Sequence, residues 1–299
     1  MLVWHGYTFR RNSCILIGNQ KLQQKIVFSV YSLYKKATGV IEMGERLTKR
    51  DIEKIEEEIK QIFEGVRVLR LDKDTTSQKH ELENILNKFQ NREADILIGT
   101  QMISKGLDFN HVTLVGILSA DMMLNFPDFK SFENTFQLVT QVSGRAGRSE
   151  KEGKVILQTY DSQSSVIKRI VDYDFEGFYE DEIKIRKLFN YTPFNNMLSV
   201  VISGKNELMV KKNITTLYNN IVYLLKERGI QDFEFILGPN PCSISKINSN
   251  YRWQILFKDD NIEINLLKGI IKYICITKRD VVFDKEVNIS IDINPNSIL

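Results

Sequence analysis

Apolar residues along the middle of the chain repeat with two different periods. Helical spacing, with an apolar residue every three or four positions, covers residues 52–63, 78–90 and 131–144. Shorter runs that alternate or are almost wholly apolar, as in strands, cover residues 66–71, 95–100, 112–118 and 154–160. Strands that alternate with helices of this length predict an α/β arrangement, a parallel sheet with helices on both faces.

The pattern changes around Pro193. Residues 161–197 form a charged, helical link that ends near this proline, which disfavours helix in the residue before it. Beyond it we expect strands at 198–204, 232–238, 251–259 and 287–295, helices at 207–229 and 261–278, and a turn-rich loop at 239–250. The order β-α-β-β-α-β predicts a smaller split α+β sandwich of the ferredoxin-like kind.

The first fifty residues show no clean period and no helix caps, so the sequence supports no element there. The domain interpretation is accordingly an irregular segment at 1–51, an α/β lobe at 52–160, a helical linker at 161–197 and an α+β domain at 198–299.

Composition narrows the class of protein. The chain has 299 residues, of which 42% are hydrophobic and 26% charged, the balance of a globular protein with a sizeable core. It contains no apolar run long enough to span a membrane and no signal-peptide pattern, so we expect a cytoplasmic protein. Cys14, Cys242 and Cys275 are too scattered for a disulfide framework or a cysteine zinc site. The net charge of +3 is too mild to indicate a nucleic-acid partner and favours a mixed, solvated surface.

The segment "LVTQVSGRAGRSEK" at 138–151 is the first candidate for chemistry. Arg145 and Arg148 are three residues apart near a predicted helix end, so both would point the same way. Each guanidinium can hold two phosphate oxygens, Gly144 lets backbone approach a ligand, and Gln141 can orient water or a phosphate. This pattern suits a polyphosphate, with the arginines as fingers on a γ-phosphoryl group. The alternative is two cations that cap a helix C-terminus.

The segment "ILIGTQMISKGLDF" at 96–109 is the second candidate. It ends a strand and then offers Ser104, Lys105, Gly106 and Asp108. A hydroxyl and exposed amides after a strand can hold a phosphate of a nucleic acid, and Asp108 can accept from a ribose hydroxyl or pair with an arginine. The alternative is an ordinary loop with an Asx turn. Both segments lie in or beside connections of the predicted sheet, whose ligands we expect beyond the carboxyl ends of its strands.

The two segments resemble the fifth and sixth motifs in the second RecA-like lobe of superfamily two helicases. Further stretches, including "VLRLDKDTT", "NFPDF", "GFYEDEIKIRK" and "YRWQILFK", are similar to the PriA family (primosomal protein N′), helicases of replication restart. The resemblance runs from about Ile52 to the end of the sequence. It implies that the α/β lobe is a helicase C-terminal lobe with ATP-driven, 3′-to-5′ unwinding of fork DNA and primosome assembly.

The resemblance also implies roles for individual residues. The catalytic residues would be Arg145 and Arg148, which reach the ATP phosphates, and Gln141, which couples nucleotide to movement. Gly106, Asp108 and Gly144 would lie beside the nucleotide, and Thr100, Gln101, Lys105 and Arg252 would contact DNA.

The final domain resembles one that contacts branched DNA and single-stranded-DNA-binding protein, and primosome proteins are further implied partners. Arg252 lies between Tyr251 and Trp253, a cation and aromatics that could stack a base or dock an acidic tail. Alternation on a strand places both aromatics on one face, so core packing is the favoured interpretation for Trp253.

The sequence also departs from the family. It has no GxxxxGK[ST] phosphate loop and no Walker B motif, which belong to the first lobe. ATP and Mg²⁺ are therefore expected only together with such a lobe, and the isolated chain is expected to lack ATPase activity. Near the family's zinc region the chain offers only His5 and Cys14, so no metal site is expected. A truncated or frame-shifted helicase is the expectation; a non-catalytic DNA- or protein-binding fragment and another superfamily two translocase are the alternatives.

Overall fold

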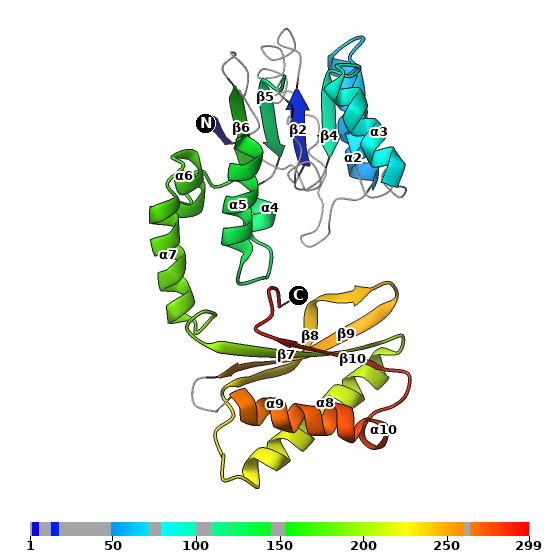
Figure 1. Cartoon of the computed structure of the whole chain (residues 1–299), viewed down its shortest axis with the longest axis vertical. Coiled ribbons are helices and arrows are strands. Elements are labelled where there is room, and N and C mark those ends of the chain that lie inside the picture. The colour runs from blue at the N-terminus through cyan, green and yellow to red at the C-terminus, as the bar shows by residue number, and fades with distance from the viewer. Residues whose placement is uncertain are drawn as a thin grey trace. The chain divides into compact units, whose positions relative to one another are not determined.

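The structure, a computed structural model, describes residues 2–5, 13–17, 49–71, 79–99, 109, 111–118, 120–144, 153–259 and 264–298 (Figure 1). The chain forms two compact units. The N-terminal unit holds Met1–Phe126 and Ser131–Tyr179, and the C-terminal unit holds Pro127–Lys130 and Glu180–Leu299. The tetrapeptide Pro127–Lys130 thus belongs to the C-terminal unit although residues of the N-terminal unit flank it on both sides.

The N-terminal unit is built on a six-stranded sheet in the order β1-β6-β5-β2-β4-β3. The strands are β1 (Leu2–His5), β2 (Ser13–Ile17), β3 (Val68–Leu71), β4 (Ile96–Gly99), β5 (Leu114–Leu118) and β6 (Lys154–Thr159). The helices between them are α2 (Lys49–Ile62), α3 (Lys79–Gln90), α4 (Asp121–Leu124) and α5 (Ser131–Ser143). Strands β3 to β6 and helices α2, α3 and α5 lie where the hydrophobic pattern predicts them.

Strands β1 and β2 come from the first fifty residues, for which the sequence supported no element. β1 pairs in parallel with β6, whereas β2 lies between β5 and β4 and is antiparallel to both. The sheet is therefore mixed rather than wholly parallel, although its other five strands run in one direction. Antiparallel hydrogen bonds are no weaker per residue than parallel ones, so a strand supplied from the N-terminal segment can pair in this direction.

Helices cover both faces of this sheet, as predicted. Within β4, Leu97 packs in the cluster that contains Phe136 of α5, whereas Ile96 and Ile98 pack in the cluster that contains Ile59 of α2. All three β4 side chains are completely buried. Because successive side chains of a strand point to opposite faces, this split explains why residues 95–100 are almost wholly apolar.

The link after β6 consists of α6 (Ser165–Val171) and α7 (Phe175–Leu188). The division between the two units falls inside α7, after Tyr179. In the first part of α7, Phe178 stacks on Phe136 with ring centroids 4.3 Å apart. In the second part, the buried Arg186 guanidinium donates to Glu182 over 2.9 Å. The residues of this one helix are thus divided between the two units.

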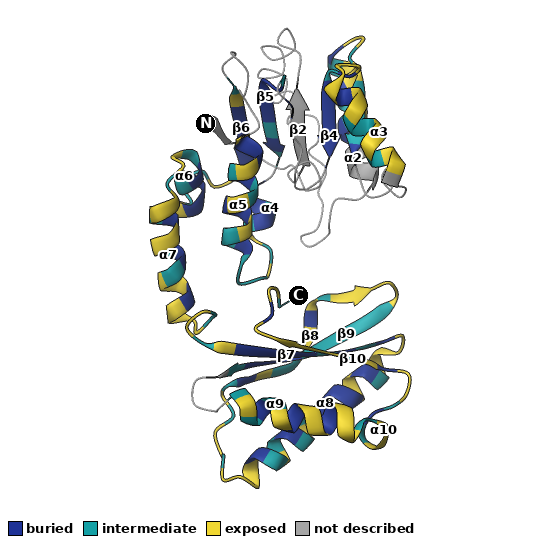
Figure 2. Cartoon of the chain, viewed as in Figure 1, coloured by how far each residue is buried: buried dark blue, intermediate teal, exposed yellow. Residues whose placement is uncertain are grey.

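The C-terminal unit has the predicted β-α-β-β-α-β order. Its elements are β7 (Asn196–Gly204), α8 (Glu207–Lys226), β8 (Ile236–Ile247), β9 (Asn250–Asp259), α9 (Ile264–Lys272), the π-helical turn η2 (Tyr273–Thr277), α10 (Arg279–Val282) and β10 (Asn288–Ile293). The sheet order is β10-β7-β9-β8 and every pair is antiparallel. Figure 1 shows α8 and α9 on one face of this sheet, and Figure 2 shows the buried side of these helices turned towards it.

Strand β8 corrects the prediction of a turn-rich loop at 239–250. Its proline, asparagine and serine residues disfavour strand, yet the segment pairs with β9 through two register shifts, between Leu237 and Asn240 and between Pro241 and Lys246. Asn248 and Ser249 have positive φ values of 49° and 64°, as in a type I′ hairpin turn. Only the tip of the predicted loop is therefore a turn, because cross-strand pairing outweighs local propensity.

The two cysteines whose side chains the structure describes have a structural role. Cys242 and Cys275 are both buried, and neither is in a disulfide. Burial raises the pKa of the Cys275 thiol to about 12 and also raises that of Cys242. Both thiols therefore stay protonated near neutral pH and act as small apolar side chains.

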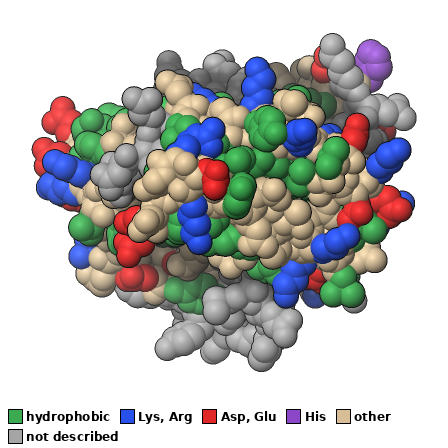
Figure 3. Space-filling view, turned by 90° about the horizontal axis from the view of Figure 1, so that it is seen from below, with side chains coloured by type: hydrophobic (Ala, Val, Ile, Leu, Met, Phe, Trp, Pro, Cys, Tyr) green, Lys and Arg blue, Asp and Glu red, His purple; other side chains and the backbone are tan. Residues whose placement is uncertain are grey.

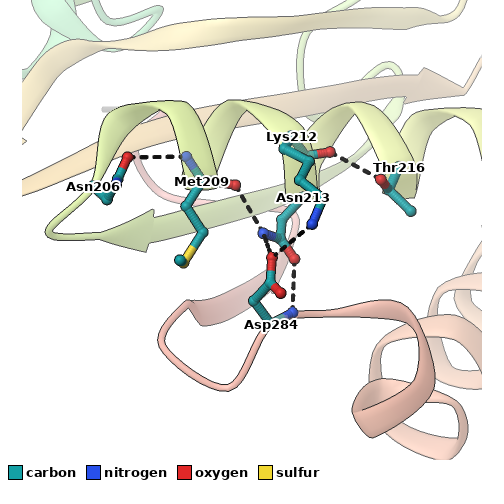
Figure 4. Close-up of polar contacts among 6 residues, drawn as sticks. All are labelled: Asn206, Met209, Lys212, Asn213, Thr216 and Asp284. Atoms are coloured by element: carbon teal, nitrogen blue, oxygen red, sulfur yellow. Dashed lines mark hydrogen bonds and ion pairs between the residues drawn. The ribbon is translucent and has the colours of Figure 1, made fainter.

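The buried side-chain amide of Asn213 links α8 to the segment before β10 by hydrogen bonds (Figure 4). The Asn213 amide nitrogen donates to the Met209 carbonyl oxygen over 2.7 Å and to Asp284 Oδ2 over 2.8 Å, and the Asp284 backbone N–H donates to Asn213 Oδ1 over 2.9 Å. Hydrogen bonds from Asn213 and Lys212 lower the pKa of the Asp284 carboxyl group. The stabilisation that this depression contributes is present above the ordinary pKa of an aspartate and is lost as the pH falls through the folded-state pKa.

We expect Asn213→Ala to lower the free energy of unfolding by about 1–3 kcal/mol, because it leaves the Asp284 N–H without its acceptor. The variant should also lose part of the acid dependence of stability that Asp284 confers. Urea titrations at several acidic pH values measure both effects. Asn220→Ala is the matched control, since Asn220 makes the same i−4 bond, to the Thr216 carbonyl over 2.8 Å, on the same helix. Equal losses in the two variants would contradict this account.

None of the helices that the structure describes combines the length and apolar character required to cross a bilayer. On the face drawn in Figure 3, lysine and arginine side chains are interspersed with acidic and apolar ones rather than gathered by sign. This agrees with the mixed surface that the overall charge predicts.

Candidate nucleotide and nucleic-acid site

Helix α5 ends at the arginine segment, which we define as residues 141–148. Gln141 is exposed in the last turn of the helix, and the Gly144 N–H donates to the Thr140 carbonyl over 3.0 Å. Arg145 and Arg148 lie outside the described residues. The structure thus fixes the helix that leads into the arginine segment, while the roles of Gln141, Gly144 and the arginines stay predictions.

Gly144 is not required by the fold that the structure describes. A Cβ added there would lie 3.5 Å from the Thr140 carbonyl oxygen and 3.7 Å from that of Gln141, ordinary van der Waals distances. Its φ is also outside the left-handed region that favours glycine. Neither steric crowding nor backbone strain among the described residues explains why a glycine occupies this helix end. Close approach of a ligand to the backbone stays the predicted reason.

The two candidate segments connect to opposite edges of the sheet. β4 ends at Gly99, on the carboxyl edge, and residues 100–108 follow it. β5 and β6 begin on the amino edge, where Leu114 pairs with Lys154, and the connection from Gly144 leads into β6 there. Helix α5 runs back across the sheet to the start of β6, as a crossover between parallel strands must. The expectation of a ligand site beyond the carboxyl ends of the strands stays a prediction.

Residues 100–108 connect these two edges. The predicted site residues among them, Thr100, Gln101, Lys105, Gly106 and Asp108, lie outside the described part of the chain. The chain is described again at the buried Phe109, close before the amino end of β5. The structure thus describes the chain on both sides of these residues, at Gly99 and at Phe109, and the roles of the five residues stay predictions.

An aromatic cluster holds the chain at the amino edge. The Phe109 ring meets Phe89 edge-on with centroids 4.8 Å apart, and His111 lies 5.1 Å from the same ring. Burial lowers the pKa of His111, and the charge of Arg92 lowers it further. A neutral His111 therefore packs as an aromatic side chain, and this cluster fixes Phe109, where the described chain resumes before β5.

A buried carboxylate orders the carboxyl edge. Asp121 accepts hydrogen bonds from Thr159 Oγ1 over 2.6 Å, from the Tyr160 N–H over 2.9 Å and from the Asp161 N–H over 3.4 Å. It thereby ties the start of α4, after β5, to the end of β6. The sequence interpretation missed this residue, because nothing near Asp121 in the sequence indicates partners about forty positions away.

The structure places Arg252 on β9 in the C-terminal unit. Its register partner is Ser203, and its guanidinium donates to the Ile244 carbonyl over 3.3 Å. The neighbouring Trp253 packs against the helix-lined core with Lys211 Nζ 5.4 Å from its ring, so the predicted core packing of Trp253 is confirmed. Alternation along β9 then puts Arg252 on the face opposite the helices. Its DNA-binding role stays a prediction.

Metal ligands do not converge in the described part of the chain: no group of three or more histidine, cysteine, aspartate or glutamate side chains there could hold an ion. His5 and Cys14 belong to strands β1 and β2, whose side chains are outside the description. The prediction that the family's zinc ligands are not preserved stays a prediction.

Comparison with known families identifies both parts of the chain. Residues 30–150 match the family described as "Helicase conserved C-terminal domain", and residues 187–296 match "Primosomal protein N C-terminal domain". In structure, the chain is similar to the C-terminal domain of the DEAD-box protein Dbp5, with 21% identity, coverage of 57% of this chain and 93% of that one, and a TM-score of 0.35. This likeness is too weak for a residue-by-residue comparison.

Relatives of much greater length match most of the chain. The replication restart protein PriA of Bacillus subtilis is 44% identical over 245 residues, 81% of this chain and 29% of that protein. Its counterpart in Synechocystis sp. is 40% identical over 286 residues, 95% of this chain and 32% of that protein, and that of Borreliella burgdorferi is 35% identical over 250 residues, 83% and 36%. The chain thus spans about a third of the length of these relatives. With both family matches falling in the order expected for a helicase lobe followed by its C-terminal domain, the chain belongs to the PriA family of replication restart proteins and corresponds to the C-terminal part of that family.

Proposed function

We propose that the chain supplies the second RecA-like lobe and the C-terminal domain of an ATP-dependent 3′-to-5′ DNA helicase that restarts replication. Hydrolysis in this proposal requires a nucleotide-binding lobe that carries a phosphate loop. The observation that carries the proposal is the geometry at the end of α5, where an exposed Gln141 and a Gly144 that is not crowded by the described residues directly precede Arg145 and Arg148 in the sequence. The order of the domains in the family supports it.

The proposed role of each residue is the one that the resemblance of the two segments to helicase motifs implies. Arg145 and Arg148 act as fingers that stabilise charge on the γ-phosphoryl oxygens of ATP, and Gln141 orients water or links the nucleotide to movement. Gly144, Gly106 and Asp108 lie beside the bound nucleotide in this proposal, as the resemblance to the helicase motifs implies. Mg²⁺ bound with ATP neutralises the phosphates, and we assign it no ligand in this chain.

The carboxyl edge is the proposed DNA side of the lobe. Thr100, Gln101 and Lys105 follow β4 there and offer hydroxyl, amide and ammonium groups for the phosphate backbone. In this proposal, DNA and nucleotide bind at opposite edges of the sheet. Residues 100–108 then transmit a conformational change from one binding site to the other. The order of Thr100, Gln101 and Lys105 before Gly106 and Asp108 supports this assignment.

The β8–β9 hairpin is the proposed DNA contact of the C-terminal unit. No acidic residue occurs between Gly238 and Lys258, whereas Lys246 and Arg252 lie on the hairpin. Lys246 Nζ lies 4.3 Å from the centre of the Tyr251 ring, which places a cation beside an aromatic surface. Such a surface suits single-stranded or forked DNA. Single-stranded-DNA-binding protein and primosome proteins are further proposed partners, all in the cytoplasm.

A chimera tests the proposed function. The matched part of this chain replaces its counterpart in the Bacillus subtilis relative, which supplies the remaining length of the protein. We expect DNA-stimulated ATP hydrolysis within about ten-fold of the parent, since both parts of the site are then present. A folded chimera that binds DNA yet shows no DNA-stimulated hydrolysis would contradict the helicase assignment and favour a binding module.

Gly144→Ala in this chimera separates a ligand role from a structural one. The added methyl group meets only ordinary contacts, so we expect the free energy of unfolding to change by no more than about 0.5 kcal/mol. DNA-stimulated hydrolysis should fall by about ten-fold or more if backbone at Gly144 approaches the nucleotide. Thermal unfolding and steady-state kinetics measure the two quantities. Unchanged kinetics in a stable variant would show that this glycine does not serve the nucleotide site.

A further inference from the structure

Strand β10 forms one edge of the sheet in the C-terminal unit. Its inner side pairs with β7, and among the described residues no strand pairs with its outer side. A sheet edge offers a row of backbone N–H and C=O groups that another strand can bind. Proteins whose edges stay unpaired commonly protect them with prolines, bulges or lysines. The two edges of this sheet, β8 and β10, differ in these features.

The edge formed by β8 is protected. Pro239 and Pro241 lack the N–H that a further strand would bind, and two register shifts interrupt the pairing of this strand. Lys246 adds a charge near its end. The β10 sequence, NISIDI, contains neither proline nor lysine and one charged residue, Asp292. Its pairing with β7 runs through all its residues without a shift, so the β10 edge is the less protected of the two.

Strand β10 also exposes apolar side chains. Ile291 is 37% exposed and Ile293 is 45% exposed. Their partners on β7, Val200 and Leu198, are completely buried. Ile289 is half-buried and packs at the border of the helix-lined core. Because alternate residues of a strand share a face, the three isoleucines form one row, which a strand added at this edge would cover.

The β10 sequence is complementary to a second copy of itself in one antiparallel register. In a two-fold pairing centred on Ile291, this residue opposes Ile291 of the second copy, and Ile289 opposes Ile293. On the other face of the strand, the exposed Ser290 opposes the exposed Asp292, whose carboxylate can accept its hydroxyl. Apolar side chains thus meet apolar side chains, and no carboxylate opposes another.

Other registers are less complementary. A shift by one residue opposes isoleucines to polar residues, because directly opposed residues share a face of the sheet. A pairing centred on Asp292 opposes the carboxylates of the two copies, and like charges in that position are destabilising. A pairing centred on Ser290 opposes Ile293 to residue 287, which precedes the strand. The register centred on Ile291 alone pairs all three isoleucines with one another.

We propose that two copies of this chain associate through their β10 edges, in the antiparallel register centred on Ile291. The two sheets then form one continuous sheet, and because the two-fold axis is perpendicular to it, α8 and α9 of both copies lie on the same face. Two short strands bury an area at the low end for specific interfaces, so the dimer is weak. We expect a Kd on the order of 10–100 µM.

Sedimentation velocity of the full chain tests the association. We expect the dimer fraction to rise with concentration up to about 500 µM, several times the expected Kd. Ile291→Lys places two ammonium groups opposite each other at the centre of the pairing and should raise the Kd by about ten-fold or more. Ile276→Lys is the matched control, since Ile276 is a 63% exposed isoleucine outside β10, and it should leave the Kd unchanged. A chain that stays monomeric over this range overturns the proposal, as do equal effects of the two substitutions.

Disulfide cross-linking tests the register. In a Cys14→Ser background, whose other cysteines Cys242 and Cys275 are buried, Ile291→Cys places two thiols opposite each other. Their Cα atoms would be about 4.5–5.5 Å apart, within reach of a disulfide. Ile293→Cys is the matched control, because its counterpart lies four positions along the other strand, about 14 Å away. We expect a mild oxidant to link Ile291→Cys about ten-fold faster or more. Equal or reversed rates overturn the proposal, because the copies would then meet through another surface.

Discussion

Replacing Arg148 by alanine in the chimera is expected to reduce DNA-stimulated ATP hydrolysis by about a thousand-fold, with little change in the KM for ATP. An arginine that faces the γ-phosphoryl group stabilises charge that develops in the transition state, so its loss lowers kcat rather than ground-state binding. Steady-state kinetics with saturating single-stranded DNA measure the effect. Arg145→Ala should behave in the same way, by a smaller or similar factor.

The control for Arg148→Ala is a substitution of Arg228. This arginine has the role that the alternative interpretation gives to Arg148, that of a cation at a helix C-terminus. Arg228 follows the end of α8, and its guanidinium donates to the Leu224 carbonyl over 2.9 Å, so it is a cation at a helix C-terminus. Arg228→Ala should cost only a few tenths of a kcal/mol in stability and leave hydrolysis unchanged. If Arg148→Ala gives the same small effects, the arginine segment is a helix cap and the finger assignment is wrong.

The largest loss of stability is expected for Phe257→Ala in the C-terminal unit. Phe257 is completely buried on β9, between Leu198 of β7 and Ile236 of β8. Removing its ring deletes buried apolar area and leaves a cavity, so the free energy of unfolding of this unit should fall by about 3–5 kcal/mol. Such a loss is a large part of the stability of an ordinary domain.

Tryptophan fluorescence can measure unfolding of the C-terminal unit by itself, because the chain has only two tryptophans, Trp4 and Trp253. In a Trp4→Phe background, Trp253 is the one tryptophan left, and it packs against the same core as Phe257. Its fluorescence in a urea titration therefore reports unfolding of the C-terminal unit. Leu208→Ala on α8 is the control, because its side chain is 79% exposed and should change stability by less than about 0.5 kcal/mol. A small loss for Phe257→Ala would mean that the core differs from the one described.

Much of the fold follows from hydrophobic spacing, and the exceptions have identifiable causes. Helices α3 and α5 and strands β4, β5 and β6 have long or strongly patterned apolar sets, so their positions could be predicted. Strands β1 and β2 are as long as β4 and β5, but they lie in the first fifty residues, where the sequence shows no regular alternation of helical and strand periods that would mark an apolar run as a strand. Strand β8 was hidden by prolines and asparagines, because its pairing partner β9, not its own composition, determines its conformation.

Site residues that are neighbours in the sequence could be predicted. Residues whose partners are brought to them only by the fold could not. Gln141, Gly144 and the arginines stand together in the sequence, so the arginine segment could be recognised from spacing alone. Asp121 and Asp128 could not, since their partners Thr159 and Ser297 are 38 and 169 positions away. A carboxylate that binds distant groups looks, in the sequence, like any other surface aspartate.

The central claim is that the arginine segment faces a nucleotide held by another lobe, and proximity labelling tests it most directly. The chimera would be incubated with DNA and an ATP analogue that carries a photoreactive group on the γ-phosphate, and the labelled peptides identified by mass spectrometry after irradiation. The account predicts label within residues 141–148, lost on competition with ATP. Efficient labelling of the nucleotide-binding lobe with no label in that segment would contradict it.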